Sequence, residues 1–335
     1  MARIPLGGMS VSDGHCRLHV TCTNVGTALS DVCSSLGANR INITLLTHLA
    51  EDGRETCGIA PCLESADGFA GSFLLKRGQG AIESVTVQRD LCILSIFPHD
   101  RRPGVAGALL GLLARIGILP SCLAGSLSSL SVSIPFSDAE KVAYGLFETF
   151  DFPPTRSPSD WSAACRGRNG LLREIRCSYD ERIIKVFSFS RQDGLDFWTV
   201  SAPRPELGRM GEALTFLGSL VMGLFFVMAH ARPDGGFQFG FCLASTRSGE
   251  IEETFARYLP GACIRKNRPV TAISFQGPHF GDRPGITGVL ADALQGAGVV
   301  PIAVSCAISS VSLVIRSHEA DRAVEALRAR FKEPS

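Results

Sequence analysis

A tripeptide and the pattern around it occur twice in this chain, at an offset of 181 in the numbering. Arg102-Pro103-Gly104 recurs as Arg283-Pro284-Gly285. The same offset relates further positions downstream of both tripeptides: Leu109 and Leu290, Leu113 and Leu294, Gly117 and Gly298, Pro120 and Pro301, Ser128-Ser129 and Ser309-Ser310, Phe150 and Phe331. Similarity at a fixed period indicates a repeated structural unit in which glycines and apolar residues have the same role each time.

The repeat continues upstream of these segments. Asp13-Gly14 matches Asp193-Gly194 at an offset of 180, and each pair lies beside a strand-like run. A further set matches at an offset of 182: His48, Asp52, Gly53 and Gly58 with His230, Asp234, Gly235 and Gly240. Small changes in offset correspond to short insertions in loops. We therefore expect two related halves of about 165 to 170 residues each.

Composition limits the class of protein. Apolar residues make up 45% of the 335 residues and charged residues 19%, so a sizeable core is available. The net charge is +1 and no block rich in lysine and arginine occurs, so we expect neither nucleic acid nor a membrane as partner. The twelve cysteines form no CxxC pair, which favours reduced, buried thiols. The N-terminus lacks a signal-peptide pattern, which predicts a cytoplasmic protein.

One uncharged segment, Ala213 to Ala229, approaches the length of a membrane span. It falls short of the roughly 20 residues that a spanning helix needs. It also contains Gly218 and Gly223, and it aligns with Leu29 to Thr47 in the first half. We therefore interpret it as a buried helix that leads into a buried strand.

Each copy of the duplicated segment begins with a β-rich run and continues, after Pro-Gly, into a helix. Apolar residues at helical spacing predict these helices over 105–116 and 286–297. Gly117 and Gly298 come next and predict the helix ends. The remaining elements are two strands and a second amphipathic helix: 118–124, 129–134 and 139–150 in one copy, and 299–305, 310–315 and 320–331 in the other.

The other parts of the chain follow the same order less regularly. The first unit has strands and helices at 17–23, 26–36, 41–49, 55–62, 66–75 and 81–87, with a turn at Glu51-Asp52-Gly53; the third has them at 196–202, 206–217, 221–231, 237–244, 250–259 and 262–265, with the matching turn at 233–236. The predicted fold class is α+β, with four tandem ferredoxin-like βαββαβ units arranged as two duplicated halves. We place the units at 1–88, 89–152, 180–267 and 268–335, with a linker at 153–179.

The ordered motifs in these units resemble a known family. The run from Arg102 to Ala106, then Gly117-Ile118, the serine-rich strand through Ile134 and the helix ending at Phe150 resemble an ACT domain, most closely those in the regulatory region of aspartokinases. The copy from Asp282 to Phe331 resembles it equally well. In the first unit, Ile41-Asn42-Ile43 is similar to the family's strand that follows the first helix.

This resemblance implies a small-molecule sensor, usually for an amino acid, that controls an enzyme, with lysine or threonine as candidate effectors. Aspartokinases carry two ACT domains behind a kinase domain, but this chain has no Lys-Phe-Gly-Gly-like start, GxxxxGK[ST] or GxGxxG. We therefore expect a non-catalytic regulatory protein, not an enzyme, with an aspartokinase as the suggested partner and a homodimer as one candidate assembly. Two alternatives remain: a structural scaffold whose ligand sites have decayed, and a chain that acts as part of an aspartate kinase.

The candidate ligand sites are the loops that lead into the first helix of each unit. Proline at the first helical position leaves backbone N–H groups pointing outwards, and together with the helix dipole these suit a carboxylate. Asp100 and Asp282 could receive an ammonium group. The candidate ligand-binding residues are Asn24, Gly26, Thr27, Asn42, His99, Asp100, Arg102, Pro103, Gly104, Val105, Leu119, His279, Asp282, Arg283, Pro284, Gly285, Ile286 and Val300. We expect no catalytic residue, metal ligand or cofactor.

Two sequence signals of a ligand site, the Pro-Gly loop and an asparagine on the strand after the first helix, do not occur in the same unit. In the ACT family an asparagine near the ligand often lies on the strand after the first helix, which the resemblance assigns to Asn42. Leu119 and Val300 replace it in the two units that have the Pro-Gly loop. The unit with Asn42 instead has Asn24-Val25-Gly26 in its loop. His48 and His230, at matching strand positions, are expected to be packing residues.

Overall fold

The computed structural model describes residues 3–50, 57–78, 82–153, 184–202, 206–232, 235–277, 280, 283–307 and 310–333. Its helices are α1 (Val25–Ala38), α2 (Gly68–Arg77), α3 (Pro103–Arg115), α4 (Ala139–Thr149), α6 (Leu207–Ser219), α7 (Ser248–Tyr258), α8 (Ile286–Gly296) and α9 (Ala320–Arg330). Its strands are β1 (Ile4–Pro5), β2 (Gly8–Cys22), β3 (Ile43–Ala50), β4 (Cys57–Glu64), β5 (Ile82–Phe97), β6 (Cys122–Gly125), β7 (Leu130–Pro135), β8 (Phe150–Asp151), β9 (Ile184–Lys185), β10 (Ser188–Ala202), β11 (Phe226–Ala231), β12 (Phe237–Ala244), β13 (Cys263–Gln276), β14 (Ala303–Ala307), β15 (Ser310–Arg316) and β16 (Phe331–Lys332).

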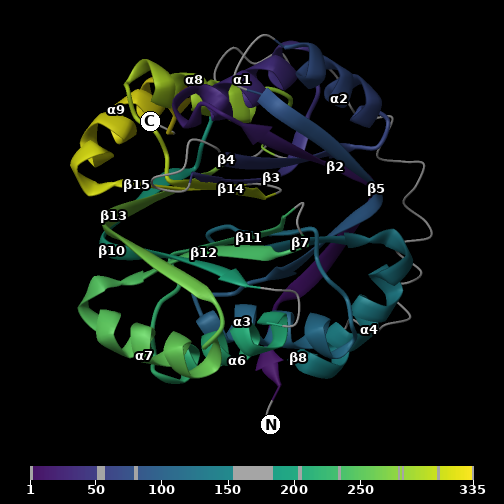
Figure 1. The fold of residues 1–335 in the computed structure, drawn as a ribbon, viewed down its shortest axis with the longest axis vertical. Helices are drawn as coiled ribbons and strands as arrows, with labels where there is room; N and C mark the ends of the chain where they lie inside the picture. Colours follow the sequence, from purple (N-terminus) through teal and green to yellow (C-terminus); the bar gives the residue numbers. More distant parts are fainter. Residues whose placement is uncertain are drawn as a thin grey trace.

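Helices cover both outer faces of a flattened, closed sheet (Figure 1). Twelve strands form one antiparallel barrel in the order β10-β12-β11-β6-β7-β5-β2-β4-β3-β14-β15-β13. We call the sheet beneath α1, α2, α8 and α9 the upper layer, and the sheet beneath α3, α4, α6 and α7 the lower layer (Figure 1). The fold is therefore a mixture of helices with one large antiparallel sheet, consistent with ACT-like domains.

Alternation of side chains along the strands explains why two sheets pack face to face. On β7, Leu130, Val132 and Ile134 join the core beneath the lower helices, whereas Ser131 and Ser133 lie between them in the sequence and are also fully buried. A strand turns successive side chains to opposite faces, so these serines face the other sheet. On β7 the small side chains face the other layer and the large apolar ones face the helices, whereas other strands place large side chains such as Phe197 and Phe226 in a separate cluster between the layers.

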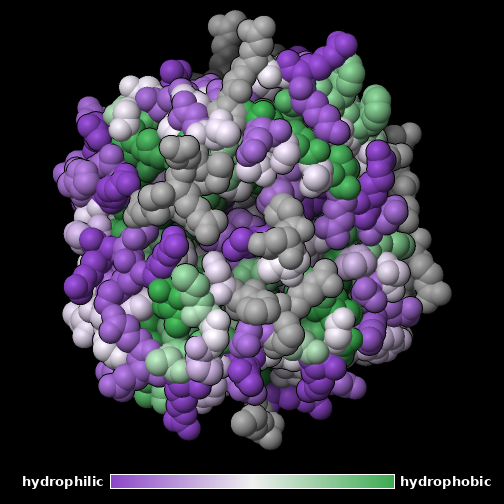
Figure 2. Space-filling view, viewed as in Figure 1, coloured by the Kyte–Doolittle hydropathy of each residue, from purple (hydrophilic) through white to green (hydrophobic). Residues whose placement is uncertain are grey.

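Apolar residues are gathered in two large cores, one beneath the helices of each layer. On the face of the molecule in Figure 2, hydrophobic residues reach the surface in separate patches between hydrophilic ones. This distribution is expected when each helix turns one apolar stripe to its sheet.

Four long strands belong to both layers. On β2, Met9 packs in the lower core and Leu18 in the upper core. The strand changes layer at an irregularity in its pairing with β5 between Ser12 and His15, where Gly14 has a φ of +73°. On β10 the pairing with β13 shifts between Gln192 and Leu195, where Gly194 has a φ of +71°. The repeated Asp-Gly pairs of the sequence therefore mark two bulges.

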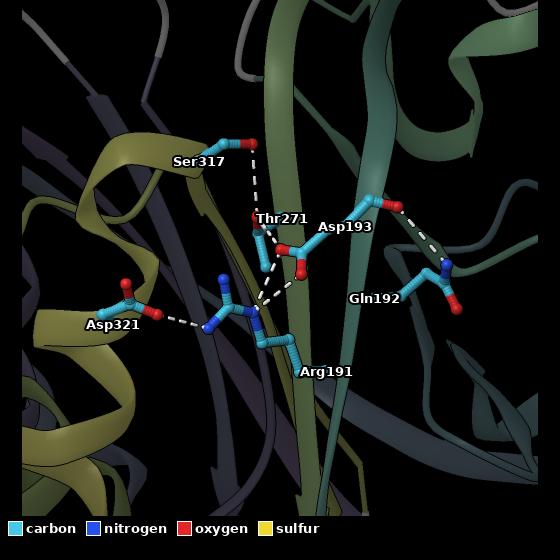
Figure 3. A network of polar contacts seen from close by, with 6 residues as sticks. All are labelled: Arg191, Gln192, Asp193, Thr271, Ser317 and Asp321. Atoms are coloured by element: carbon cyan, nitrogen blue, oxygen red, sulfur yellow. Dashed lines mark hydrogen bonds and ion pairs between the residues drawn. The ribbon is translucent and has the colours of Figure 1, made fainter.

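A polar network holds the bulge of β10 (Figure 3). The Thr271 hydroxyl donates to Asp193 Oδ1 at 2.7 Å, and Arg191 Nε donates to the same carboxylate at 2.9 Å. Arg191 Nη1 also donates to Asp321 on α9 at 2.6 Å. The hydrogen bond from Thr271 is the largest cause that lowers the pKa of the Asp193 carboxyl. The network thus joins β10, β13 and α9 at the point where β10 changes layer.

The predicted helices over 105–116 and 286–297 are confirmed as α3 and α8, and Gly117 and Gly298 have the positive φ values, +72° and +65°, of helix-ending glycines. The strands predicted from 118 and 299 start later, at Cys122 and Ala303, because Pro120 and Pro301 lack an N–H for the ladder.

Strands that the sequence suggests are separate run together in the structure. The predicted closing strand at 81–87 and the β-rich run that follows it form one strand, β5. In the same way, the predicted strand at 262–265 and the β-rich run after it form one strand, β13. The expected boundaries at 88/89 and 267/268 therefore fall inside strands. The linker at 154–179 and the turn residues 51–53 and 233–234 lie outside the described residues.

The uncharged segment 213–229 contains the end of α6 and the start of β11, which confirms the prediction of a helix followed by a strand. In the part of the chain that the structure describes, no helix has the length and apolar character needed to span a membrane.

Candidate functional site

Two helices and two strands from the two ends of the sequence meet in the upper layer. β3 pairs antiparallel with β14, with Leu45 opposite Ala307. Above this pair, α1 packs on α8, and the hydroxyls of Ser30 and Ser34 donate to Asp292 Oδ1 at 2.5 and 2.7 Å. We call this contact the upper seam. It places the N-terminus of α8 beside the start of β3.

The close approach of α1 and α8 requires small residues at their contact. A β-carbon on Gly37 would lie 2.8 Å from the α-carbon of Gly285, and one on Gly288 would lie 3.1 Å from the carbonyl oxygen of Cys33. Gly285 has a φ of +89°, a conformation that side chains other than glycine rarely adopt. The first turn of α8 is therefore fixed against the end of α1.

A pocket opens at the upper seam, with a volume of about 320 Å³ that includes solvent at its mouth. Most of this volume is open to solvent; the enclosed part is only about 20 Å³, room for about one water molecule, so the pocket is a shallow hollow. Its lining comes from the start of β3, the loop into α8, and β14 and β15: Asn42, Ile43, Thr44, Phe280, Arg283, Gly285, Ile286, Thr287, Cys306, Ala307, Ser310 and Val311.

The lining suits an anionic group at one end. The N-cap residue of α8 is Gly285, which has no side chain to bond the first N–H groups of the helix, so these groups suit a ligand. The helix dipole and the guanidinium of Arg283 both favour a negative charge there.

The rest of the wall is neutral. Burial raises the pKa of the Cys306 thiol well above its usual value, so this thiol stays protonated. The Ser310 hydroxyl is buried without a hydrogen-bond partner among the described residues, so it is available to a ligand. No carboxylate side chain is among the described residues that line the pocket.

The upper seam brings together signals that lie in different units of the sequence. Asn42, Arg283, Gly285 and Ile286 all line the same pocket. Asn42 directly precedes β3, whereas Arg283 and Gly285 belong to the loop before α8 and Ile286 is the first residue of α8. Pro284 lies next to them in the chain; His279 and Asp282 lie outside the described residues.

The corresponding corner of the lower layer, at the contact of α3 with α6, is filled by protein. The guanidinium of Arg101 lies over the ring of Phe225, 5.2 Å from its centroid. The Leu224 N–H donates to the Arg101 carbonyl oxygen at 2.7 Å. Leu224 corresponds to Asn42 at the same offset that relates His48 to His230. Arg101, which precedes the candidate residues Arg102, Pro103, Gly104 and Val105, is therefore held by protein at this corner, whereas the half-buried Gly104 has space beside it.

Other candidates of this loop have partners within the protein. His99 is buried; its Nε2 donates to the carbonyl oxygen of Ser126 at 2.9 Å, and its Nδ1 accepts from the Arg101 N–H at 3.2 Å. Burial is the main cause that lowers the pKa of His99. Asp100 is exposed and forms an ion pair with Arg102 at 3.4 Å.

The remaining candidates lie at the start of α1 and in the segments before β6 and β14. Asn24 caps α1, because its Oδ1 accepts from the Gly26 N–H at 3.0 Å. The Thr27 hydroxyl donates to Asp31 at 2.8 Å. Leu119 and Val300 precede β6 and β14 rather than lying on them. These residues are not in the pocket of the upper seam.

Sequence reasoning missed several pocket residues. Phe280, Thr44 and Thr287 gave no signal of their own, whereas Ser310 belongs to a repeated serine pair that marked a turn. In the described part of the chain, no group of three or more histidine, cysteine, aspartate or glutamate side chains is placed to hold a metal ion.

No protein-family model matches the sequence, and no curated protein matches it either. Solved structures do match in fold. The structure of aspartate kinase from Synechocystis is 15% identical, with a TM-score of 0.78 over 98% of this chain and 56% of that chain. The chain thus spans little more than half the length of that enzyme. Its fold is that of a large part of an aspartate kinase structure.

Two shorter likenesses have lower scores. The regulatory subunit of aspartate kinase from Thermus thermophilus is 16% identical, with a TM-score of 0.40 over 44% of this chain and 99% of that chain. Aspartokinase III from E. coli in complex with lysine and aspartate is 19% identical, with a TM-score of 0.35 over 44% of this chain and 34% of that chain.

These findings correct one expectation from the sequence. The prediction that the chain is not an enzyme was wrong, because its whole length resembles part of an enzyme, the aspartate kinase from Synechocystis. The prediction depended on missing nucleotide-binding motifs, and short motifs are an insensitive test at 15% identity.

Proposed function

We propose that this chain acts as part of an aspartate kinase and binds an amino-acid effector in the pocket of the upper seam. One observation carries the proposal: Asn42 at the start of β3 lines the same pocket as the uncapped N-terminus of α8. The effector carboxylate is assigned to the N–H groups of Ile286 and Thr287 and to Arg283. Asn42 and Ser310 are assigned to the polar groups of the ligand.

A useful affinity requires burial of the ligand at the seam. A helix dipole contributes about 1 kcal/mol, whereas micromolar binding requires about 8 kcal/mol. The rest must come from enclosure between β3 and α8, and since the hollow between them is shallow, these segments must move to admit and enclose the effector. Phe280 and Val311 supply apolar surface, and the hydroxyl and amide groups supply orientation.

The position of the pocket also gives the effector a way to act. Its walls include residues from two distant parts of the sequence: Asn42–Thr44 on one side, and Phe280, Arg283 and Gly285–Thr287 on the other. A ligand that contacts both segments stabilises one arrangement of α1 and α8 over others. Regulation requires this difference in affinity between two arrangements.

The proposal includes the finer description of the fold as four ACT-like units in two halves, at 1–88, 89–152, 180–267 and 268–335. The upper layer then pairs the first unit with the fourth, and the lower layer pairs the second with the third. Support comes from the order of elements in the chain and from the pairings β3–β14 and β6–β11.

A scaffolding role is the second candidate for the lower layer. The contact of Arg101 with Phe225 fills the corner that matches the effector pocket. Under this reading only the upper seam binds a ligand, and the contact of α3 with α6, which we call the lower seam, holds the two parts of the lower layer together.

A thermal-shift screen of the twenty amino acids tests the proposal. We expect saturable stabilisation by one or a few of them, with lysine and threonine as first candidates, because a ligand that binds only the folded state raises its stability. Asn42→Leu, which introduces the residue found at position 224, and Arg283→Ala should abolish the effect. Arg209→Ala, at an exposed arginine, is the matched control and should keep it.

An assay of ATP-dependent aspartate phosphorylation, with the chain alone and with added aspartokinase, tests the kinase part. A rate that changes with the effector in the wild type but not in Asn42→Leu supports it. Absence of stabilisation by every amino acid, together with no effect on any phosphorylation rate, contradicts the proposal.

A further inference from the structure

Two free thiols face each other at the ends of neighbouring strands in the upper layer. β2 ends at Cys22 and β4 begins at Cys57, and the antiparallel register places these two residues directly opposite each other. Both belong to the upper core. Among the cysteines in the described ranges, no other two are register partners. We call Cys22 and Cys57 the strand-end thiols.

The register of the strand-end thiols fits a disulfide without movement of the strands. Residues directly opposite each other turn their side chains to the same face, with α-carbons about 4.5 or 5.5 Å apart, depending on the hydrogen-bonding pattern. A disulfide requires α-carbons about 4.4 to 6.8 Å apart. Both values lie within this range, so the backbone admits a bond between the two sulfur atoms.

The two side chains already interact with each other. Cys57 donates a hydrogen bond to the sulfur of Cys22, and this bond is the largest cause that lowers the pKa of Cys22, against the effect of burial. The same bond, followed by burial, raises the pKa of Cys57. Since the thiolate is the nucleophilic form of cysteine, Cys22 is suited to react first, and Cys57 to remain a protonated thiol until it reacts with Cys22.

The position at the strand ends gives a small oxidant access. The exposed fractions of Cys22 and Cys57 are 0% and 4%, but Thr23 and Asn24, which follow Cys22, are exposed. The ends of an element open locally at a lower free energy than the whole protein unfolds. Cys62 and Cys122 differ in this respect. Their sulfur atoms are 3.7 Å apart, but both residues are fully buried between the layers, so an oxidant reaches them only when the layers separate.

From the register, the contact and the strand-end position, we propose that Cys22 and Cys57 form a reversible disulfide when the protein meets hydrogen peroxide. The Cys22 thiolate attacks one peroxide oxygen, the O–O bond breaks, and Cys22 becomes a sulfenic acid while hydroxide leaves. The sulfur of Cys57 then attacks the sulfur of Cys22, the S–O bond breaks, and water leaves with the proton of Cys57. In total two thiols and one peroxide give one disulfide and two waters, and two electrons pass from sulfur to the peroxide.

The bond links the entry of α1 to the sheet beneath it. Cys22 lies three positions before Val25, where α1 begins, and Cys57 is the first residue of β4. Because α1 packs on α8 at the upper seam, the disulfide fixes the start of one of the two seam helices. A dithiol such as dithiothreitol reverses the bond by thiol–disulfide exchange.

Mass spectrometry of the full chain, treated with hydrogen peroxide while folded and then unfolded and alkylated, tests the proposal. We expect ten of the twelve cysteines to be alkylated, and all twelve after treatment with dithiothreitol. Trypsin leaves Cys22 on one peptide with Cys33, and Cys57 on another with Cys62, so fragmentation spectra assign the bond. Twelve alkylated cysteines, a link between Cys62 and Cys122, or oxidation that resists dithiothreitol would overturn the proposal.

Variants test the separate roles of the two sulfurs. Cys57→Ser keeps a hydroxyl donor to Cys22 but removes the second sulfur, so the sulfenic acid on Cys22 should persist and be trapped by dimedone. Cys22→Ala should form neither the disulfide nor an adduct at Cys57. Cys122→Ala is the matched control, because it disrupts the other thiol pair, and it should form the bond as the wild type does.

Circular dichroism melts establish that each variant is folded before it is oxidised. A folded Cys57→Ser without an adduct at Cys22, or a folded Cys122→Ala without the disulfide, contradicts the proposal. All these measurements are made without an amino acid present. Their outcome is therefore separate from that of the proposed function.

Discussion

Gly37 and Gly285 touch across the upper seam, so closely that a β-carbon on Gly37 would lie 2.8 Å from the α-carbon of Gly285. The contact joins the end of α1 to the first turn of α8. That turn also contributes Gly285, Ile286 and Thr287 to the pocket of the upper seam, so the contact of the two helices helps to fix one wall of the pocket.

Gly37→Ala should therefore separate the two helices. The nearest atoms belong to the backbone and cannot rotate away, and such overpacking typically costs about 1 to 3 kcal/mol. We expect the free energy of unfolding in urea to fall by this amount and any stabilisation by an effector to weaken. Gly296→Ala, at an exposed site on α8 with nothing within 4 Å, is the control: it should not lower the free energy of unfolding and should leave any stabilisation by an effector unchanged.

The lower seam offers a pair of glycines on one helix with opposite expected outcomes. A β-carbon on Gly107 would lie 2.5 Å from the carbonyl oxygen of Gly211 and 2.7 Å from the N–H nitrogen of Thr215. Gly107→Ala should therefore destabilise the protein, by about 1 to 3 kcal/mol. Gly111→Ala on the same helix meets nothing within 4 Å and should stabilise it by about 0.5 to 1 kcal/mol. Urea denaturation measures both values. Equal changes in the free energy of unfolding for the two variants would refute the close contact of α3 with α6 at Gly107.

Stability should fall on acidification because buried histidines are held neutral. Burial lowers the pKa of His48 to about 4, and burial followed by Arg17 does the same for His19, from a usual 6.5. The unfolded chain binds more protons between these values, so stability is fully present above pH 6.5 and is lost as the pH falls towards 4. Each histidine contributes on the order of 3 kcal/mol over this range.

Urea denaturation at pH 7.5 and pH 5 measures this loss. His48→Gln should show a smaller difference between the two pH values than the wild type, because the group that takes up the proton on unfolding is gone. The exposed His318, replaced in His318→Gln, is the control and should leave the difference unchanged. Identical pH dependence in all three proteins would show that His48 does not contribute.

The contact of Arg101 with Phe225 should contribute measurable coupling. A guanidinium over an aromatic ring contributes about 0.5 to 2 kcal/mol, more when the pair is desolvated. A double-mutant cycle with Arg101→Ala and Phe225→Leu should give a coupling energy at the upper part of this range. The matched pair Arg77 and Phe73, at 4.5 Å on the exposed face of α2, should give a smaller value. A larger coupling energy for the exposed pair would contradict the prediction that desolvation strengthens the contact of Arg101 with Phe225.

Local pattern was sufficient for the elements and their order. Helical spacing after Pro103 and before Gly117 predicted α3 because the periodicity and the helix-ending glycine act over one or two turns. Along β7, serine alternates with leucine, valine or isoleucine, and this pattern already indicated a strand with a different kind of neighbour on each face. Pro120 similarly explains the late start of β6, since the missing N–H is a property of one residue.

Only the tertiary structure decided which segments meet. The sequence left Asn42 and the loop at Gly285 in different units, and the antiparallel pairing of β3 with β14 placed both on one pocket. The same holds for Arg17 and His230, which approach because two layers close into a barrel. Periodicity describes the faces of a helix or strand, but the choice of neighbour between distant edges depends on the packing of the whole chain. For that reason the repeat could be predicted from the sequence, and the sites between its copies could not.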